Sequence, residues 1–214
     1  MKSRNSSKIL TVFFKLLYSR LAWAYDFVAA TVSLGLWNNW ILSSKPFLSG
    51  TKILEIGFGT GHLIRSLDCD GKNHIGIELS WQMCKQTSKR LSAKSCNPAL
   101  VNGQAQKLPF KNEVFDQVVM TFPSDYIKED SSWGEISRVL IPGGDLFILM
   151  SARITGMHWF YRLIQWLFHI PDQSVDWEDI LEEKYKHADL KCTVTTRNAP
   201  HSELLIIRGK KREL

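Results

Sequence analysis

The sequence lacks the cysteine patterns that hold metal ions or build disulfide frameworks. It contains 4 cysteines. None of them belongs to a CxxC pair or has a histidine at metal-ligand spacing, so we expect reduced thiols and no bound metal. Reduced thiols are typical of proteins inside the cell, and we predict a cytoplasmic location. The cysteines are Cys69, Cys84, Cys96 and Cys192.

Long apolar runs are also missing. The uncharged stretch 27–42 is shorter than a bilayer span and contains Gly35. Near the N-terminus, Lys15 and Arg20 interrupt the apolar run that a secretion signal would need. We therefore expect neither a transmembrane helix nor a signal peptide.

Acidic residues are scarce at the start of the chain. Residues 1–50 hold six basic side chains and one acid, Asp26, and so carry five of the six net positive charges. A nucleic-acid partner is not expected, because such proteins more often spread basic residues over a whole groove. A short basic N-terminus suits either peripheral contact with an anionic membrane or a solvated helix end. The oligomeric state is left open.

Two kinds of pattern divide the chain near Pro46. Before it, polar residues recur at helical spacing from Lys8 to Ser19, and a second helix is predicted over 26–42. After it, apolar strands alternate with helices, which predicts an α/β fold: a mostly parallel sheet with helices on both faces. We divide the chain into an N-terminal helical lid, 1–46, and a ligand-binding domain, 47–214.

The expected strands of that domain cover residues 52–56, 74–79, 99–101, 115–122 and 145–150, and a closing hairpin lies near 191–196 and 204–208. The expected helices cover 60–67, 80–91, 131–140, 155–169 and 177–185. The helix over 155–169 is apolar round most of its circumference. Its extra apolar side suits a hydrophobic substrate pocket, packing against residues 9–42, or contact with lipid.

The segment EIGFGTGH (residues 55–62) joins a strand to a helix, so its backbone can approach a ligand at the carboxyl end of the sheet. A nicotinamide-dinucleotide loop would place its third glycine at position 62, which is His62. Glu55 is an awkward neighbour for a pyrophosphate and suits a ligand that carries an ammonium group. Glu78 ends the next strand, 17 residues past Gly61, where its carboxylate can accept hydrogen bonds from both hydroxyls of a ribose.

Five segments, in this order over about residues 50–150, resemble the class I methyltransferases that use S-adenosylmethionine. The segments are ILEIGFGTG, GIELS, NGQAQKLPF, FDQVVMTFP and EISRVLIPGGDLFIL. The pattern is most similar to small-molecule methyltransferases akin to those of quinone biosynthesis. The resemblance implies a Rossmann-like, seven-stranded sheet in which the C-terminal β-hairpin supplies the antiparallel strand, and S-adenosylmethionine as cofactor.

The resemblance also implies where the cofactor would lie. The glycine loop would surround its methionine part, Glu78 would hold the ribose, and Leu79 would pack on the adenine. The implied cofactor-binding residues are Glu55, Gly57, Gly59, Gly61, Glu78, Leu79, Gln104, Ala105 and Thr121.

Gln104 departs from the family pattern, which usually has an acid before Ala105 to accept from the adenine amino group. A neutral Gln accepts the same bond more weakly, because hydrogen bonds to charged groups are worth about 1.5–3 kcal/mol against about 1 kcal/mol for neutral ones. We expect weaker cofactor binding, not its loss.

The protein would have to align the acceptor, exclude water and, for an oxygen acceptor, remove a proton. The implied methyl-facing element is TFPS (residues 121–124), which differs from the Asn/Asp-Pro-Pro-Tyr element of enzymes that methylate nucleobase amines. The candidate catalytic residues are Tyr25, Tyr126 and His158, with Asp26 in a structural role beside Tyr25.

We therefore expect a methyltransferase acting on a small hydrophobic acceptor such as a quinone-like ring, a polyketide or a lipid. Two alternatives stay open at this point. One is a protein of the same fold that binds the cofactor without turnover, and the other is an RNA methyltransferase, suggested by the basic termini alone.

Overall fold

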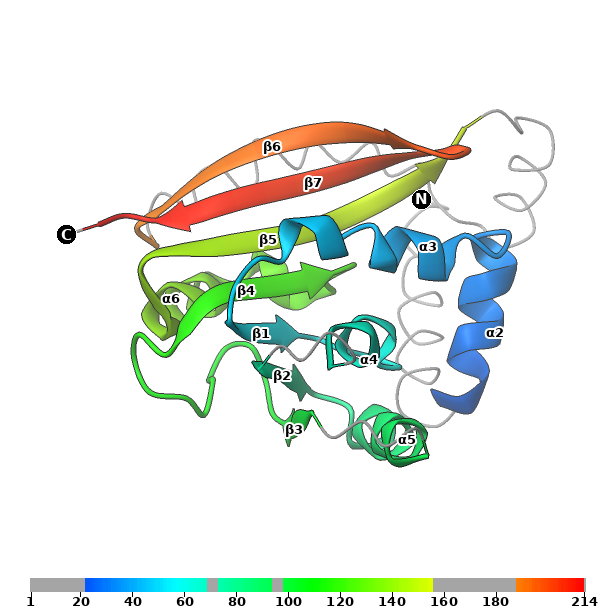
Figure 1. Cartoon of the computed structure of the whole chain (residues 1–214), viewed down its shortest axis with the longest axis horizontal. Coiled ribbons are helices and arrows are strands. Elements are labelled where there is room, and N and C mark those ends of the chain that lie inside the picture. The colour runs from blue at the N-terminus through cyan, green and yellow to red at the C-terminus, as the bar shows by residue number, and fades with distance from the viewer. Residues whose placement is uncertain (1–21, 69–72, 94–97, 156–187, 214) are drawn as a thin grey trace, which may run out of the picture.

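One seven-stranded sheet organises the chain, in the order β3-β2-β1-β4-β5-β7-β6 (Figure 1). The computed structural model describes residues 22–68, 73–93, 98–155 and 188–213. The strands are β1 (Lys52–Ile56), β2 (Asn73–Glu78), β3 (Ala99–Asn102), β4 (Phe115–Thr121), β5 (Leu140–Ile154), β6 (Leu190–Ala199) and β7 (Ser202–Lys211). The helices among the described residues are α2 (Ala22–Val32), α3 (Trp37–Leu42), α4 (His62–Asp68), α5 (Trp81–Ser92) and α6 (Asp130–Val139), with short 3-10 turns η1 (Lys45–Phe47) and η2 (Asp125–Lys128).

The pairing of the strands confirms the predicted fold class. β1 pairs in parallel with both β2 and β4, and β3 and β5 extend the parallel part outward. β7 runs antiparallel to β5 and to β6, so the closing hairpin supplies the antiparallel strand. The chain order of the strands reverses between β1 and β4, which are neighbours in the sheet.

Two apolar clusters, one on each face of the sheet, form the core. Leu54 and Ile56 of β1 belong to the cluster that includes α6, whereas Ile53 belongs to the cluster that includes α4. Successive side chains of a strand point to opposite faces, and both faces are covered here. This is why the central strands read as continuous apolar runs rather than as alternating ones.

The helix predicted over 26–42 is wrong as a single element. It is two helices, because Leu34 and Gly35 take left-handed backbone angles, with φ of 53° and 80°. Gly35 N donates to Ala30 O at 2.7 Å, which closes the end of α2. Ser33 Oγ then accepts from Trp37 N at 3.0 Å at the start of α3. The turn lets α3 change direction across the sheet.

α3 is built into the main core. Its Trp40 and Ile41 are buried in the same cluster as Ile53 of β1, and Trp40 Nε1 donates to Ser202 Oγ at 2.8 Å. Figure 1 shows α2 and α3 at the end of the sheet toward which β1, β2 and β4 point. The division into 1–46 and 47–214 stays a prediction, with its boundary in η1.

The first strands and helices after position 46 confirm the predicted elements to within two residues. β5 is longer than expected, since it begins at Leu140 and bulges at 141–144 before its regular pairing with β4 resumes at Asp145. The predicted helix near residues 8–19, the helices over 155–169 and 177–185, and His158 lie outside the described residues. No described helix is long and apolar enough to cross a membrane.

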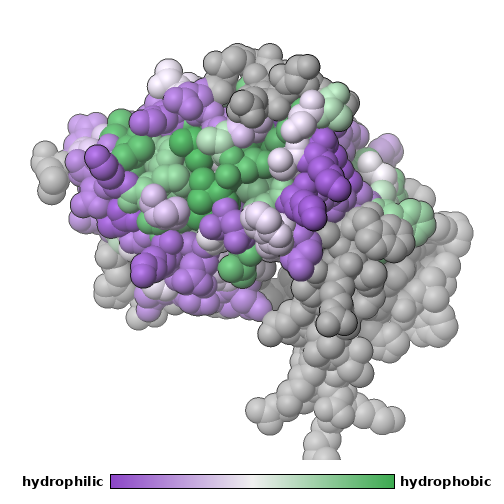
Figure 2. Space-filling model, turned by 90° about the horizontal axis from the view of Figure 1, so that it is seen from below, coloured by the Kyte–Doolittle hydropathy of each residue, from purple (hydrophilic) through white to green (hydrophobic). Residues whose placement is uncertain are grey.

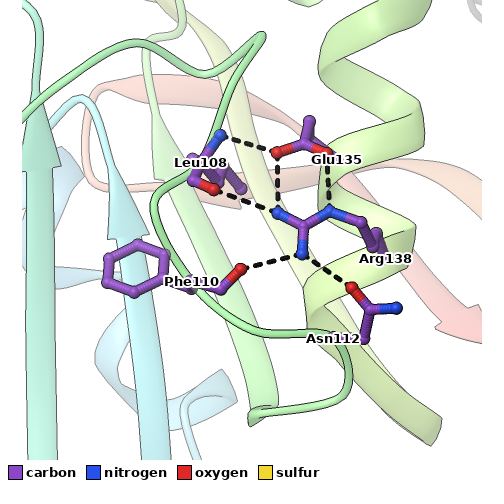
Figure 3. A network of polar contacts seen from close by, with 5 residues as sticks. All are labelled: Leu108, Phe110, Asn112, Glu135 and Arg138. Atoms are coloured by element: carbon purple, nitrogen blue, oxygen red, sulfur yellow. Dashed lines mark hydrogen bonds and ion pairs between the residues drawn. The ribbon is translucent and has the colours of Figure 1, made fainter.

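The connection from β3 to β4, residues 103–114, forms no helix. Arg138 of α6 holds this connection by donating to Leu108 O at 3.0 Å, Phe110 O at 2.8 Å and Asn112 Oδ1 at 2.9 Å (Figure 3). Glu135 accepts from Leu108 N at 2.6 Å and from Arg138 Nε at 2.6 Å. One ion pair therefore supplies the partners that a helix would otherwise provide to these backbone groups.

Because residues 103–114 form no helix, part of the core is left uncovered on the β3 side of the molecule. Figure 2, which looks at this side, shows an apolar patch surrounded by hydrophilic residues. Ile75 of β2, Val101 of β3 and Phe110 pack against the core cluster and are only partly buried. Among the described residues, no helix follows β3 to cover them.

The first prediction concerns Arg138. Arg138→Ala should lower the free energy of unfolding by about 2–3 kcal/mol, because it removes charged hydrogen bonds from two partly buried carbonyl oxygens. Urea unfolding followed by circular dichroism measures the change. Arg153→Ala is the matched control, since the Arg153–Glu203 pair is largely exposed and should be worth under about 1 kcal/mol. Equal losses in the two variants would contradict the role given to Arg138.

Candidate active site

The glycine-rich loop between β1 and α4 has the backbone conformation that its sequence predicts. Gly57, Gly59 and Gly61 take φ values of 78°, 52° and 79°, which side-chain-bearing residues rarely adopt. A Cβ on Gly61 would lie 2.4 Å from Thr87 Cγ2, so the loop passes directly against α5. A Cβ on Gly59 would meet nothing within 4 Å, which leaves space for a ligand beside the loop.

Glu78, at the carboxyl end of β2, is joined to this loop. Its Oε2 accepts from Gly59 N at 3.1 Å and its Oε1 accepts from Ser80 N at 2.8 Å. The residue is 8% exposed, and burial raises the pKa of its carboxyl although these backbone donors act in the opposite direction. The carboxylate is therefore held in one orientation, and the lone pairs that it keeps can accept further hydrogen bonds.

Helix α5 fixes the loop from its other side. Thr87 Oγ1 donates to Gly59 O at 2.9 Å, and Arg90 Nη1 donates to Thr60 O at 3.3 Å. Ser80 caps this helix as predicted, since its Oγ accepts from Met83 N at 3.3 Å. The loop is thus held between a carboxylate of β2 and two donors of α5.

The residues expected at the adenine follow the ends of β2 and β3, which are paired in parallel through Glu78 and Asn102. Asn102 Nδ2 donates to the carbonyl oxygen of Leu79 at 3.0 Å, which sets the direction of the chain after β2. Leu79 is 72% exposed, Gln104 is exposed and Ala105 is buried. The two segments lie together at one edge, and contact of Leu79, Gln104 and Ala105 with a cofactor stays a prediction.

Glu55 lies below the loop, on β1. Its Oε2 is 3.4 Å from His74 Nε2 of β2, and both side chains are buried. The contact lacks hydrogen-bond geometry, and no described residue donates to Glu55 Oε2. Burial raises the pKa of Glu55 to about 8, and the nearby charge of Glu78 acts in the same direction. The role of Glu55 toward a methionine group stays a prediction.

An aromatic cluster, Trp37, Trp40 and Phe122, lies where β4 ends. Thr121 is the last residue of β4, and Phe122 follows with a φ of 50°, unusual for a bulky side chain. The ring of Phe122 stacks on Trp37 of α3 at 4.4 Å between centroids and contacts Trp40 at 6.2 Å. Backbone strain of this kind is found most often at functional sites. The amino-acid sequence alone did not reveal this cluster, because its members come from distant segments.

Of the three candidate catalytic residues, the structure describes the side chain of one. The Tyr126 hydroxyl of η2 donates to Ile56 O at 3.2 Å, and it lies 3.1 Å from the position of a Cβ on Gly57. Tyr126 therefore packs directly against the start of the glycine loop. Tyr25 belongs to α2 but its side chain is outside the described set, as is His158, so the catalytic roles stay predictions.

Asp26, on α2, contacts the residues that follow and hold the glycine loop. It lies 3.3 Å from His62 Nε2 and 2.5 Å from Arg90 Nη1. The sequence offered one signal for this role, since Asp26 is the single acid of the first 50 residues. No group of three or more His, Cys, Asp or Glu side chains among the described residues could hold a metal ion.

Comparison with known proteins agrees with this geometry. Residues 54–148 match a family model described as a methyltransferase domain. The demethylmenaquinone methyltransferase of Symbiobacterium thermophilum is 30% identical over 173 residues, which are 75% of this chain and 67% of that protein. A ubiquinone/menaquinone biosynthesis C-methyltransferase of Ruegeria is 29% identical over 156 residues, 68% of this chain and 62% of that one.

A solved structure, the geranyl diphosphate C-methyltransferase of Streptomyces coelicolor, superposes with a TM-score of 0.60 at 11% identity, covering 80% of this chain and 78% of that one. At this identity the likeness concerns the fold. The chain belongs to the class I S-adenosylmethionine-dependent methyltransferases. It spans between 55 and 67% of the length of the first four curated relatives that it matches.

The second prediction concerns the pH dependence of stability. Between about pH 4.5 and pH 8 the folded protein keeps a proton on Glu55 that the unfolded chain releases, so this group lowers stability as the pH rises through that window. Glu55→Gln cannot ionise and should therefore gain stability relative to the natural protein between pH 5 and pH 8. Urea unfolding at both pH values measures the gain.

The exposed Glu129→Gln is the control for the loss of one carboxylate. An equal pH dependence for Glu55→Gln and the natural protein would mean that Glu55 is already ionised in the fold across this window.

Proposed function

We propose that this chain transfers a methyl group from S-adenosylmethionine to a small, apolar acceptor. The observation that carries the proposal is the bond between Glu78 and Gly59, which joins the carboxylate at the end of β2 to the glycine loop at the end of β1. The ribose hydroxyls of the cofactor would donate to Glu78 while its methionine part lies along the glycine loop. One ligand would therefore contact both the carboxylate and the loop. Ligands of open α/β sheets bind at this carboxyl end.

The residues present suit this cofactor. Glu78 offers a carboxylate already oriented by two backbone N–H groups, and the two hydroxyls of a vicinal diol can both donate to its remaining lone pairs. The space beside Gly59 admits a ligand without a clash. Leu79, mostly exposed, offers apolar surface for a purine ring, with Ala105 on the neighbouring segment. The neutral Gln104 would accept from the purine amino group.

The cofactor would supply the electrophilic methyl group on its sulfonium. The chain would position the reactants and exclude water. Glu78 and the loop would hold the ribose and the methionine part of the cofactor, and the aromatic cluster would keep water from the acceptor. Tyr126 donates to the carbonyl oxygen of Ile56 and thereby supports the loop from below. A proton-accepting role for Tyr25, Tyr126 or His158 belongs to the proposal and awaits mutation.

An apolar acceptor is supported by the chemistry at the end of β4. Trp37 of α3 stacks on Phe122, which follows Thr121 at the end of β4. β4 pairs with β1, the strand that leads into the glycine loop. Stacked aromatic surfaces favour flat or apolar ligands over charged ones. The names of the relatives point in the same direction, since they concern demethylmenaquinone and the biosynthesis of ubiquinone and menaquinone.

The third prediction tests the cofactor site. Glu78→Ala should weaken binding of S-adenosylhomocysteine by about 1–3 kcal/mol, because it removes charge-assisted hydrogen bonds to the ribose. Isothermal titration calorimetry measures the affinity, and the exposed Glu113→Gln serves as a control that should bind normally. Binding of a nicotinamide dinucleotide by the natural protein, without any response to S-adenosylhomocysteine, would sink the proposal.

The fourth prediction tests the acceptor side. Glycine accepts a positive φ, so Phe122→Gly removes the ring without adding backbone strain. It should raise the KM for a quinol or isoprenoid acceptor roughly tenfold through the lost apolar contact, and leave the affinity for S-adenosylhomocysteine unchanged. Transfer of a tritiated methyl group from S-adenosylmethionine measures the KM.

Phe47→Leu is the matched control, because Phe47 stacks on Phe147 at 5.0 Å ahead of the amino end of β1. Cofactor binding without transfer to any quinol, isoprenoid or phenolic acceptor would instead favour a protein of this fold that binds without turnover.

A further inference from the structure

Helix α2 faces the rest of the protein with a narrow stripe that includes one charge. Ala29 and Ser33 are buried and Asp26 is half-buried, three positions that share a face at helical spacing. Phe27, on the other side of the helix, is 76% exposed. The only charged group on this stripe is therefore turned inward, toward α4 and α5.

The Asp26 carboxylate contacts two elements at once. Oδ1 lies within hydrogen-bond distance of His62 Nε2, at 3.3 Å, and Oδ2 forms an ion pair with Arg90 Nη1, at 2.5 Å. The Thr60 side chain also donates to it. Burial acts to raise the pKa of Asp26, but the hydrogen bonds from His62, Thr60 and Arg90 outweigh it and lower the value to about 2. The group is an anion throughout the physiological range.

All three partners of Asp26 belong to the cofactor loop or hold it. Thr60 is a residue of the loop, His62 is the first residue of α4 immediately after it, and Arg90 donates to Thr60 O at 3.3 Å as well as to Asp26. Figure 1 shows α2 beside α5 at this end of the sheet. Asp26 therefore holds the loop on the side of α2, while Gly59 N of the same loop donates to Glu78 on the side of β2.

We propose that Asp26 is a positioning residue that couples the docking of α2 on the glycine loop to binding of the cofactor. The inference rests on the proposed function and deepens it. When Asp26 holds Thr60 and His62, the loop keeps the shape in which Gly59 meets Glu78, and the cofactor binds to that shape. By linkage, the cofactor must then strengthen the attachment of α2 by the same factor.

The coupling also gives α2 a role in the order of events. With Asp26 engaged, α2 lies against the loop, and α3 follows it to the aromatic cluster through the turn at 34–35. A loaded cofactor would therefore favour a closed acceptor side, and an empty loop would favour an open one. The acceptor would meet its binding surface mainly after the cofactor has bound.

The test measures affinity and protection together. Asp26→Asn keeps the size of the side chain but removes its charge, and it should weaken S-adenosylhomocysteine binding about 5- to 30-fold by isothermal titration calorimetry. Glu203→Gln is the matched control, because it removes an acid–arginine pair that joins β5 to β7 far from the loop in the sheet order. It should leave the affinity unchanged even where both variants lose thermal stability.

Hydrogen exchange supplies the reciprocal measurement. S-adenosylhomocysteine should slow exchange of the α2 amides, residues 22–32, in the natural protein at least severalfold, and this protection should shrink in Asp26→Asn. A merely structural Asp26 would change the melting temperature without changing the difference that the cofactor makes. Asp26→Glu, which keeps the charge on a longer stem, should recover part of the affinity.

The outcomes are distinguishable from those of the proposed function. If the natural protein binds S-adenosylhomocysteine but α2 exchanges equally with and without it, the coupling is refuted while the cofactor site stands. The same holds if Asp26→Asn binds with unchanged affinity. If the natural protein does not bind it at all, the proposed function fails first. Should Asp26→Asn not fold, Asp26→Glu takes its place, and the proposal fails if that variant binds S-adenosylhomocysteine with the affinity and the α2 protection of the natural protein.

Discussion

The site depends on one constraint, the reversal of strand order between β1 and β4. These strands are hydrogen-bonded neighbours, yet the chain leaves their carboxyl ends toward opposite faces: α4 packs with one core cluster and α6 with the other. Because β1 and β4 are parallel neighbours, the glycine loop that follows β1 and Phe122 that follows β4 both lie at the carboxyl ends of the central strands. A cofactor carried by the first and an acceptor resting on the second would meet there without further adjustment of the backbone.

Three carboxylates surround the loop, and each has a different environment. Glu78 accepts two backbone hydrogen bonds, Asp26 has an arginine, and Glu55 has neither, being buried beside His74. Two buried anions a short distance apart repel strongly, so a protonated Glu55 allows Glu78 to be charged at its side. A neutral Glu55 on β1 is therefore compatible with an ionised Glu78 on the neighbouring strand β2.

Much of the sheet could be predicted from sequence because strands buried on both faces leave continuous apolar runs, as in 52–56 and 115–121, separated by glycine-rich turns. The break at Leu34 and Gly35 could not, since its direction depends on Trp37 and Trp40 finding Phe122 and Ser202. The bulge before Asp145 was hidden because Pro142, Gly143 and Gly144 resemble an ordinary turn.

For the candidate site, motif spacing singled out Glu78 and the glycine loop, and the structure brings them together because two adjacent parallel strands set their relation locally. Their contact with a cofactor stays a prediction. Two of the three partners of Asp26, His62 and Arg90, lie 36 and 64 positions further along the chain, and no periodicity connects them with it. The strain at Phe122 is likewise a property of packing and leaves no mark in the residue pattern.

The close approach of Gly61 to Thr87 has a consequence for the history of the sequence. A Cβ at position 61 would lie 2.4 Å from the Thr87 methyl group, so the two positions share one fixed volume. A side chain at position 61 would need a smaller residue at position 87 or a shift of α5 away from the sheet, and it would also have to take a φ of 79°, which side-chain-bearing residues rarely adopt. A lineage that enlarged residue 61 would therefore strain the loop and displace α5 at once, so position 61 should stay glycine among relatives.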